Sequence, residues 1–511
     1  MRKIIYYISC IIILNLTACE PYFSGLDIKN DHQPDISTVM GDINQYPSLI
    51  SGAYNNWWHH MLGANDGDSW VFATNSDAFT AGAGNWDLQT YYYRKNYEKP
   101  MIPNTDKNAG FPRTLWYNQY SKISTVRNML AMIENEQLIY KEDNKDQTYK
   151  ILANCYFLIG TFYTELSLLF DKCFIVTEST DLQNITADDI KPASEAKALA
   201  IEYLDKCIEI CNTESFTNFG GLLPSGIVDN NIKLRQFANF MAARALTYYP
   251  RNKADYNSVD WNEVKKYISD GLSENVKATL PQQGWDEWSY AAASWPGGNQ
   301  WGRIGMRVIN MMAYAGDPGA VWPLPIDFGQ GQTLPEASSP DFRLGTDFVY
   351  YPSVNTPTGG LSYDGYTKYS SYVLNRFSET GQQSGEGDLY FFTKAESDLL
   401  YAEAALQTSE TSKAVQMVNL TRVNRGKLND IDVNSSKEEI LEAIYYERFV
   451  ECGYAYTVTP FYDRRRTPID KFQLTTRSFR QLPIPILELS FYNIDSYTFG
   501  GEQDKNDQYN F

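Results

Sequence analysis

Apolar residues recur at every third or fourth position through several long segments, and this spacing constrains the fold more than any other feature of the chain. Between residues 150 and 170 the spaced positions are Leu152, Cys155, Ile159, Phe162, Leu166 and Leu169. This period is typical of an α-helix with one apolar face. The same pattern predicts helices over 115–134, 194–212, 235–249, 259–272, 390–407, 411–425 and 437–451.

Helices of this kind must pack against neighbouring helices, because one helix cannot bury its own apolar face. Their spacing along the chain resembles a degenerate tetratricopeptide-like array rather than a strict repeat. We therefore predict a mainly α fold, with a helical repeat scaffold over 115–275 and 390–451. Residues 50–110 and 280–388 are expected to form a large irregular region, and 280–388 is rich in Gly, Pro and Trp, as loops are. The tail, 480–511, is also expected to be irregular.

The N-terminus carries an export signal. Arg2 and Lys3 precede the apolar segment Ile4–Leu16, which is too short to span a bilayer. The sequence Leu16-Thr17-Ala18-Cys19 that follows looks like a bacterial lipobox, in which Cys19 becomes the lipidated first residue. Each buried CH2 of an acyl chain contributes about 0.8 kcal/mol, so several chains anchor firmly. We assign 1–18 to a signal peptide and 19–47 to a lipidated tether; the alternative is a plain cleaved signal with an incidental cysteine.

Composition excludes several classes of protein. The formal charge of −18 disfavours binding to nucleic acid or to anionic lipid surfaces. The chain has three histidines, all before residue 61, and no CxxC pair, so we expect no metal site and no cofactor. Cys207 and Cys211 lie one helical turn apart, and we expect them to be small buried residues rather than a metal or redox site.

Aromatic residues make up 14% of the chain, and this excess indicates the ligand chemistry. Aromatic rings stack on the C–H faces of sugars, while short polar side chains on loops bind their hydroxyls. Two segments combine these residue types. The candidate glycan-binding residues are Trp70, Asn85, Trp86, Tyr92, Trp285, Trp288, Tyr290, Trp295, Trp301 and Trp322. For any one tryptophan the alternative is packing, to which the helical spacing assigns Trp116 and Trp261.

A series of short motifs, each weak alone, occurs in a fixed order behind the lipobox. They are Leu49–Tyr54, the helix with Trp116, Tyr120 and Ile123, the segment Ala153–Phe170, Ser339–Leu344, Ala395–Ala404, Val418–Gly426, Ile444–Glu451, Asp463-x-Arg465 and Leu482–Leu489. Together they resemble the SusD/RagB family of Bacteroidetes outer-membrane nutrient-binding lipoproteins. Phe449 and Gly453-Tyr454 depart from the family pattern, and the closing Gln-Asn-Pro signature is absent near 495–500.

The resemblance implies a single SusD-like domain over 48–511 and a role at the cell exterior. Such a lipid-anchored outer-membrane protein would capture oligosaccharides on its loops and deliver them to a partner SusC-like TonB-dependent transporter, without catalysis. Two alternatives stay open. The same scaffold could bind another nutrient such as peptide, or the protein could be a surface glycoside hydrolase.

The hydrolase alternative needs a suitable pair of carboxylates. Glu396 and Glu403 share one helix face, but about 10 Å apart along the axis and beside an apolar stripe that must pack. We expect Glu447, Glu451, Asp463 and Arg465 to form ion pairs that lock the C-terminal helices. The sequence therefore predicts a binding protein rather than an enzyme.

Overall fold

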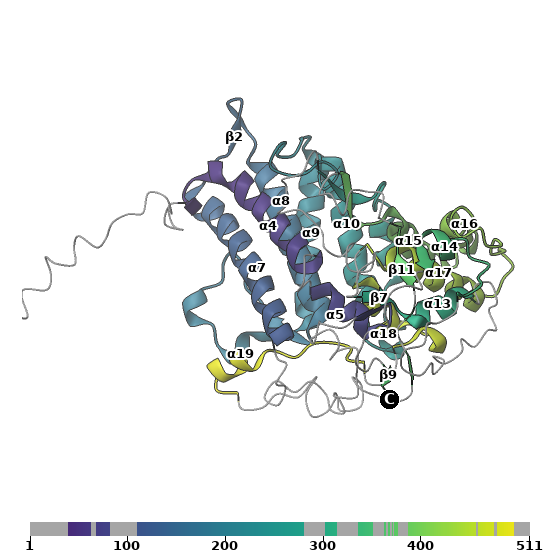
Figure 1. Ribbon diagram of the computed structural model, residues 1–511. Coiled ribbons are helices and arrows are strands. Elements are labelled where there is room, and N and C mark those ends of the chain that lie inside the picture. The colour runs from purple at the N-terminus through teal and green to yellow at the C-terminus, as the bar shows by residue number, and fades with distance from the viewer. Residues whose placement is uncertain are drawn as a thin grey trace, which may run out of the picture.

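The computed structural model describes residues 39–62, 68–81, 110–280, 302–313, 336–350, 362–363, 366–367, 370, 372–376, 387–455, 458–474 and 478–494. Within them the fold is mainly helical, as the apolar period predicted (Figure 1). The longer helices are α4 (Tyr46–Leu62), α7 (Gly110–Glu136), α8 (Thr148–Leu169), α9 (Ala193–Thr213), α10 (Asn231–Tyr248), α15 (Lys394–Gln407), α16 (Thr411–Arg422) and α17 (Lys437–Cys452). The shorter ones are α5 (Asp68–Asn75), α11 (Lys253–Tyr256), α12 (Trp261–Ile268), α13 (Met306–Ala313), α14 (Arg343–Thr346), α18 (Thr459–Arg466) and α19 (Ile486–Phe491).

Successive helices pack side by side, from α4 and α7 through α8, α9 and α10 to α15, α16 and α17 (Figure 1). Helix α8 lies inside this layer. It is long and apolar enough to cross a membrane, but 89% of its most apolar window is buried inside the protein. Its composition therefore reflects packing: Phe157, Phe162 and Leu166 are fully buried. Buried side chains form one core around α4 and α7–α10 and a second around α13 and α15–α17.

Short strands form antiparallel pairs. Among the described residues these are β1 (Phe79–Ala81) with β7 (Gly302–Ile304), β6 (Val276–Leu280) with β12 (Gly387–Phe392), β8 (Phe348–Tyr350) with β11 (Tyr372–Leu374), β4 (Lys172–Phe174) with β5 (Ile190–Pro192), β2 (Lys141–Glu142) with β3 (Lys145–Asp146), and β9 (Ser362–Tyr363) with β10 (Tyr366–Thr367).

Three local expectations differ from the structure. Residues 390–392, predicted as the start of a helix, belong to strand β12, where Leu389 and Phe391 are both buried at the alternate spacing of a strand. The segments expected to be irregular also contain helices: most of α4 and all of α5 lie within 50–110, α13 and α14 lie within 280–388, and α19 lies within 480–511. Tyr46, within the predicted tether, is fully buried, and its hydroxyl donates to the Met40 carbonyl over 2.7 Å. This part of the predicted tether therefore packs on the helical body.

Candidate ligand-binding site

The two aromatic-rich segments share an anchor. Strands β1 and β7 are paired antiparallel, and Ala81 lies opposite Gly302 in their register. Segment 82–109 follows Ala81 directly, and segment 281–301 ends directly before Gly302. One ladder of two short strands therefore fixes one end of each segment beside the other, although more than 200 residues separate them in the chain.

The other end of segment 281–301 is also fixed by strand pairing. Leu280, the last residue of β6, lies opposite Gly387, the first residue of β12. Thr279, next to it, is tied across the same pair, because its hydroxyl donates to Asp388 over 2.6 Å. Segment 281–301, which carries Trp285, Trp288, Tyr290, Trp295 and Trp301, is thus preceded in the chain by one strand pair and followed by another.

The base beneath β1 and β7 is closely packed. Gly305 donates its backbone N–H to the Ala78 carbonyl over 3.0 Å, and a Cβ at this position would lie 2.0 Å from the Asp77 carbonyl oxygen. Only glycine permits this approach. Tyr454 donates from its hydroxyl to the same Ala78 carbonyl over 2.8 Å, and Ser370 donates to the Ile304 carbonyl over 2.6 Å.

Charged groups fix the same base from below. The Asp77 carboxylate lies 3.4 Å from guanidinium nitrogens of both Arg307 and Arg464. Arg307 also donates to the carbonyls of Lys471 and Gln473, over 2.7 and 3.0 Å. Because a guanidinium donates in a fixed planar fork, these bonds set the position of β1 and α13 against the C-terminal part of the chain.

Of the ten candidate glycan-binding residues, Trp70 lies within the described residues. Its side chain is 3% exposed, and its ring centroid lies 4.5 Å from that of Phe79 in β1. In this structure the ring therefore packs beneath the strand anchor and presents no open face for stacking. The other candidates lie outside the described residues: Asn85, Trp86, Tyr92, Trp285, Trp288, Tyr290, Trp295, Trp301 and Trp322.

The tryptophans assigned to packing by their helical spacing do pack. Trp116 is 1% exposed and lies edge-on to Phe170, with ring centroids 5.0 Å apart. Trp261 is half-buried against Tyr256, with centroids 5.3 Å apart. Helical spacing thus assigned these two rings to packing correctly, but it did not identify Trp70, which packs as well.

The two glutamates of α15 are buried among arginines. Glu396 is paired with Arg244 and accepts a hydrogen bond from the Tyr248 hydroxyl over 3.0 Å. Glu403 accepts from Arg448 and Arg466, each over 2.7 Å. Burial raises the pKa of Glu403, but the two guanidiniums outweigh it and lower the pKa to about 2. Such a carboxylate stays ionised at neutral pH and is a poor general acid.

A second network forms around Arg343. This guanidinium donates to Asp341 over 2.6 Å, to Glu447 over 2.7 Å and to Glu451 over 2.8 Å, and all four side chains are at most 1% exposed. Burial raises the pKa of Glu451, but Arg376, Arg343 and Arg425 lower it to about 2. The pKa of Glu447 is instead raised, with burial as the largest cause.

The predicted locking of the C-terminal helices is confirmed for three of the four residues. Glu447 and Glu451 pair with Arg343, and Asp463 pairs with Arg448 and with Arg466. Arg465 was predicted wrongly. Its guanidinium donates to the backbone carbonyls of Leu168, Arg480 and Tyr248 rather than to a carboxylate, because it lies where those three backbone segments meet.

A family model described as the SusD family matches residues 237–508, just over half of the chain. The chain belongs to the SusD family. A search of curated proteins found no match.

Solved SusD-like structures show the same fold. A SusD-like protein from Bacteroides fragilis NCTC 9343 has a TM-score of 0.61 at 14% identity, over 92% of this chain and 99% of that chain. A SusD homologue from Bacteroides thetaiotaomicron VPI-5482 has a TM-score of 0.57 at 12% identity, over 91% and 98%. A laminarin-binding SusD-like protein has a TM-score of 0.54 at 17% identity, over 88% and 97%. At these identities the likeness shows the fold.

Five cysteines of this SusD-family chain lie within the described residues, and they are core residues. Cys155, Cys173, Cys207, Cys211 and Cys452 are all buried free thiols. Burial raises the pKa of Cys173 and of Cys452 to about 12, so these thiols stay protonated at neutral pH. Within the described ranges, no group of three His, Cys, Asp or Glu side chains is placed to hold a metal ion.

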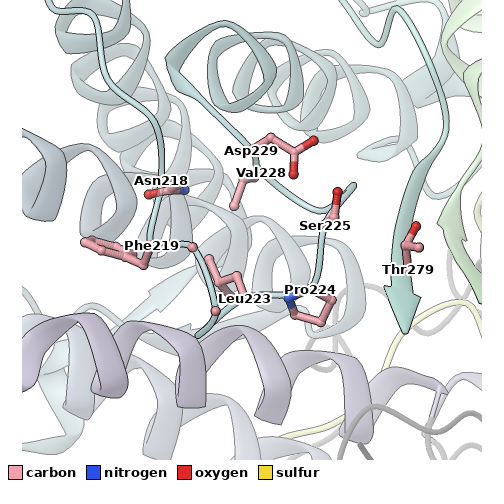
Figure 2. A pocket seen from close by; sticks show the side chains of 10 residues that line it. Asn218, Phe219, Leu223, Pro224, Ser225, Val228, Asp229 and Thr279 are labelled. Atoms are coloured by element: carbon pink, nitrogen blue, oxygen red, sulfur yellow. The ribbon is translucent and has the colours of Figure 1, made fainter. Parts of the chain in front are cut away.

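A pocket of about 410 Å³ lies in a part of this SusD-family fold that the sequence reasoning missed (Figure 2). It opens in the loop between α9 and α10, over residues 218–229, and Thr279 of β6 forms one wall. The loop carries Gly220, Gly221, Pro224 and Gly226, which predict turns but not a cavity. The loop sequence alone therefore could not predict the pocket, because one wall is formed by strand β6, about 50 residues further along the chain.

Proposed function

We propose that this protein is a glycan-binding lipoprotein, anchored in the outer membrane through Cys19, that captures oligosaccharides and delivers them to a SusC-like TonB-dependent transporter. Three observations support the proposal. The chain belongs to the SusD family, one protein of similar fold is named for binding laminarin, and the N-terminus carries the lipobox-like Leu16–Cys19.

The single observation that carries the site is the pairing of Ala81 with Gly302. It brings together the ends of two segments that combine tryptophans and tyrosines with Asn, Asp and Gln, at 85–93 and 285–301. A shared rigid base suits a binding surface that must hold several rings in one arrangement. The rings expected to stack on sugar are Trp86, Trp288 and Trp301.

A role in binding rather than hydrolysis is supported by the carboxylates. A glycosidase requires one carboxyl group that is protonated near neutral pH and another that faces substrate. Glu403 and Glu451 are buried, and guanidiniums hold their pKa values at about 2. Among the described residues, the acidic side chains of α15 and α17 that the sequence singled out serve to join helices.

The test uses the mature chain carrying Cys19→Ala, which keeps the protein free of lipid. Calorimetry against a panel of neutral oligosaccharides, acidic oligosaccharides and peptides should give binding to at least one neutral oligosaccharide. Chromatography of each bound ligand after long incubation should show no cleavage. Binding confined to peptides would replace the glycan by another nutrient, and turnover by pure protein would establish a hydrolase.

Delivery is tested separately in membranes. The lipid-anchored protein, solubilised in mild detergent, should copurify with a TonB-dependent transporter. An unrelated lipoprotein of the same membrane, expressed to the same level, serves as the control. Equal recovery of the transporter with both proteins would contradict the proposed partnership while leaving glycan capture in place.

A further inference from the structure

The pocket in the α9–α10 loop has walls that are fixed before any ligand arrives. Asn218 and Asn154 of α8 form a reciprocal pair of side-chain amide bonds, over 2.9 and 3.1 Å. The Asn218 backbone N–H donates to the Asp229 carbonyl over 2.9 Å, which joins the two limbs of the loop. Ser51 of α4 donates to the Leu222 carbonyl over 2.5 Å and ties the tip of the loop to the helix beneath it. The cavity is therefore preformed, which lowers the entropic cost of binding.

Strand β6 closes the pocket on its other side. Thr279 donates its backbone N–H to the Ser225 carbonyl over 2.9 Å, so the loop extends the β6–β12 sheet by one bridge. Gly226 makes this approach possible: it has a φ of +93°, and a Cβ there would lie 2.8 Å from the Lys277 carbonyl oxygen. Its N–H donates to the Asp229 carboxylate over 2.9 Å. Loop and strand are thus held at a fixed separation.

The lining divides into an apolar and a polar part (Figure 2). Phe219, Leu223, Pro224 and Val228 supply the apolar part, and all four are buried. The polar part holds exposed Ser225, exposed Asp229 and half-buried Thr279. A volume of about 410 Å³ with mostly apolar walls and a few polar groups is typical of small-molecule sites, at the lower end of their size range.

The position of the pocket links it to the proposed glycan site. Thr279 in its wall is followed by Leu280 and then by segment 281–301. One residue thus separates the pocket wall from the start of the aromatic-rich segment in the chain. An oligosaccharide is long enough to occupy two adjacent places, and linked contacts raise affinity more than either alone.

We propose that this pocket is a second subsite, which takes one neutral sugar ring carrying a methyl group, either a 6-deoxyhexose or an N-acetylhexosamine. The proposal rests on the proposed function. The methyl group would enter the apolar part between Leu223 and Val228, while ring hydroxyls would bind Ser225 and Asp229. A uronic acid would bring its charge close to the Asp229 carboxylate and would be disfavoured.

Two pairs of probes distinguish the two sources of the methyl group. N,N′,N″-Triacetylchitotriose is compared with cellotriose, which lacks the N-acetyl groups, and methyl L-fucoside with methyl L-galactoside, which has a hydroxyl in place of one hydrogen on C6. Binding to the mature Cys19→Ala chain is measured by saturation-transfer NMR titration. In at least one pair the methyl-bearing probe should bind about four-fold or more tightly, as expected for burying one methyl group. Equal binding within both pairs, or no binding of any probe, would overturn the proposal.

Ser225→Trp and Ser215→Trp form a matched pair of variants. Both serines are exposed and lie on the same loop, but only Ser225 lines the pocket. Ser225→Trp fills the pocket and should lower the affinity for the preferred probe at least about ten-fold. Ser215→Trp should bind that probe with the same affinity as the wild type. Equal circular dichroism spectra and urea midpoints establish that both variants are folded.

The outcomes separate this inference from the proposed function. If panel oligosaccharides bind wild type and Ser225→Trp equally, the subsite is wrong while glycan capture stands. If methyl L-fucoside binds and Ser225→Trp abolishes its binding, but no oligosaccharide binds, the pocket is a monosaccharide site and oligosaccharide capture is wrong.

Discussion

A carboxylate oxygen of Glu403 lies 2.7 Å from a guanidinium nitrogen of Arg448 in the protein interior, and neither side chain has exposed surface. Arg466 lies at the same distance from the same carboxylate. The three residues come from α15, α17 and α18, so one carboxylate joins three helices. A buried ion pair adds little net stability over an apolar equivalent, but removing one partner leaves a buried charge without compensation.

Glu403→Gln should therefore lower the free energy of unfolding by about 3–5 kcal/mol. The glutamine keeps the size and a hydrogen-bond acceptor but leaves Arg448 and Arg466 without their shared counter-charge. Urea denaturation followed by circular dichroism measures the change. Glu410→Gln is the control, because Glu410 pairs with Lys265 at the surface, where an ion pair contributes at most about 1 kcal/mol. Equal losses in the two variants would mean that the buried network is not what stabilises this end of the protein.

Stability should fall with acid between about pH 4.5 and pH 2. The folded pKa values of Glu403 and Glu451 are about 2, below the ordinary value of 4.5. The stability that these two carboxylates contribute is fully present above their pKa in the unfolded chain. It is lost as the pH falls through their pKa in the folded protein. Glu447 has a raised pKa, so its contribution changes in the opposite direction and offsets part of the loss.

Urea midpoints measured at intervals from pH 6 to pH 2 test this dependence. Glu403→Gln should show a shallower decline than wild type over that range, because one of the two groups with a lowered pKa is gone. Glu410→Gln should follow the wild-type slope. Parallel curves for wild type and Glu403→Gln would contradict the assignment of Glu403 as an ionised buried group.

The helices could be predicted from sequence because their signal is local. Each long apolar stripe in 115–275 and 390–451 was found as a helix, and Trp116 was placed in the core by its spacing alone. The pairing of Ala81 with Gly302 could not be predicted, because strands of three residues carry no period and their partners lie far apart in the chain. The α9–α10 pocket was missed for the same reason, since its wall depends on the bridge from Ser225 to Thr279.

The partners of Arg465 likewise could not be predicted from sequence, because two of the three lie far from it in the chain. Its charge suggested a carboxylate partner, but its place between α8, α10 and the segment before α19 gives it three carbonyls instead. Arg465→Lys should cost about 2–4 kcal/mol of unfolding free energy, because one compact ammonium cannot reproduce bonds made by a planar fork. Urea denaturation measures the cost.

The control for Arg465 is Arg113→Lys, a conservative change at an exposed position of α7. It should change the free energy of unfolding by no more than about 0.5 kcal/mol, the range expected for surface substitutions. A similarly small effect of Arg465→Lys would show that the backbone carbonyls around it obtain equivalent partners from elsewhere.

Cys19→Ala should release the protein from the membrane when the full chain is exported. The lipobox-like Leu16–Cys19 would place the acyl chains on this residue, and the net charge of −18 disfavours attraction of the chain to an anionic lipid surface. Fractionation followed by immunoblotting should move the protein from the membrane to the soluble fraction. Cys10→Ala, which alters the signal segment without touching the lipobox, should stay anchored. Undiminished recovery of Cys19→Ala with membranes would exclude lipidation at Cys19 as the tether.

Glycan affinity should be modest and should depend on the tryptophans of the loops. An exposed platform leaves much of the ligand in water, so we expect dissociation constants from about micromolar to millimolar, or about −8 to −4 kcal/mol. Longer oligomers should bind more tightly because they reach several rings. Trp288→Ala or Trp301→Ala should each cost about 1–3 kcal/mol of binding free energy when the ring stacks on sugar, with little change in the urea midpoint.

Trp70→Ala provides the contrasting case for these variants. Its ring is 3% exposed and packs on Phe79, so its loss should destabilise the fold by about 3–5 kcal/mol. Calorimetry with the best oligosaccharide of the panel, together with urea denaturation, separates the two effects. Unchanged affinity in Trp86→Ala, Trp288→Ala and Trp301→Ala, with wild-type binding established, would place the sugar on other loops than those anchored at Ala81 and Gly302.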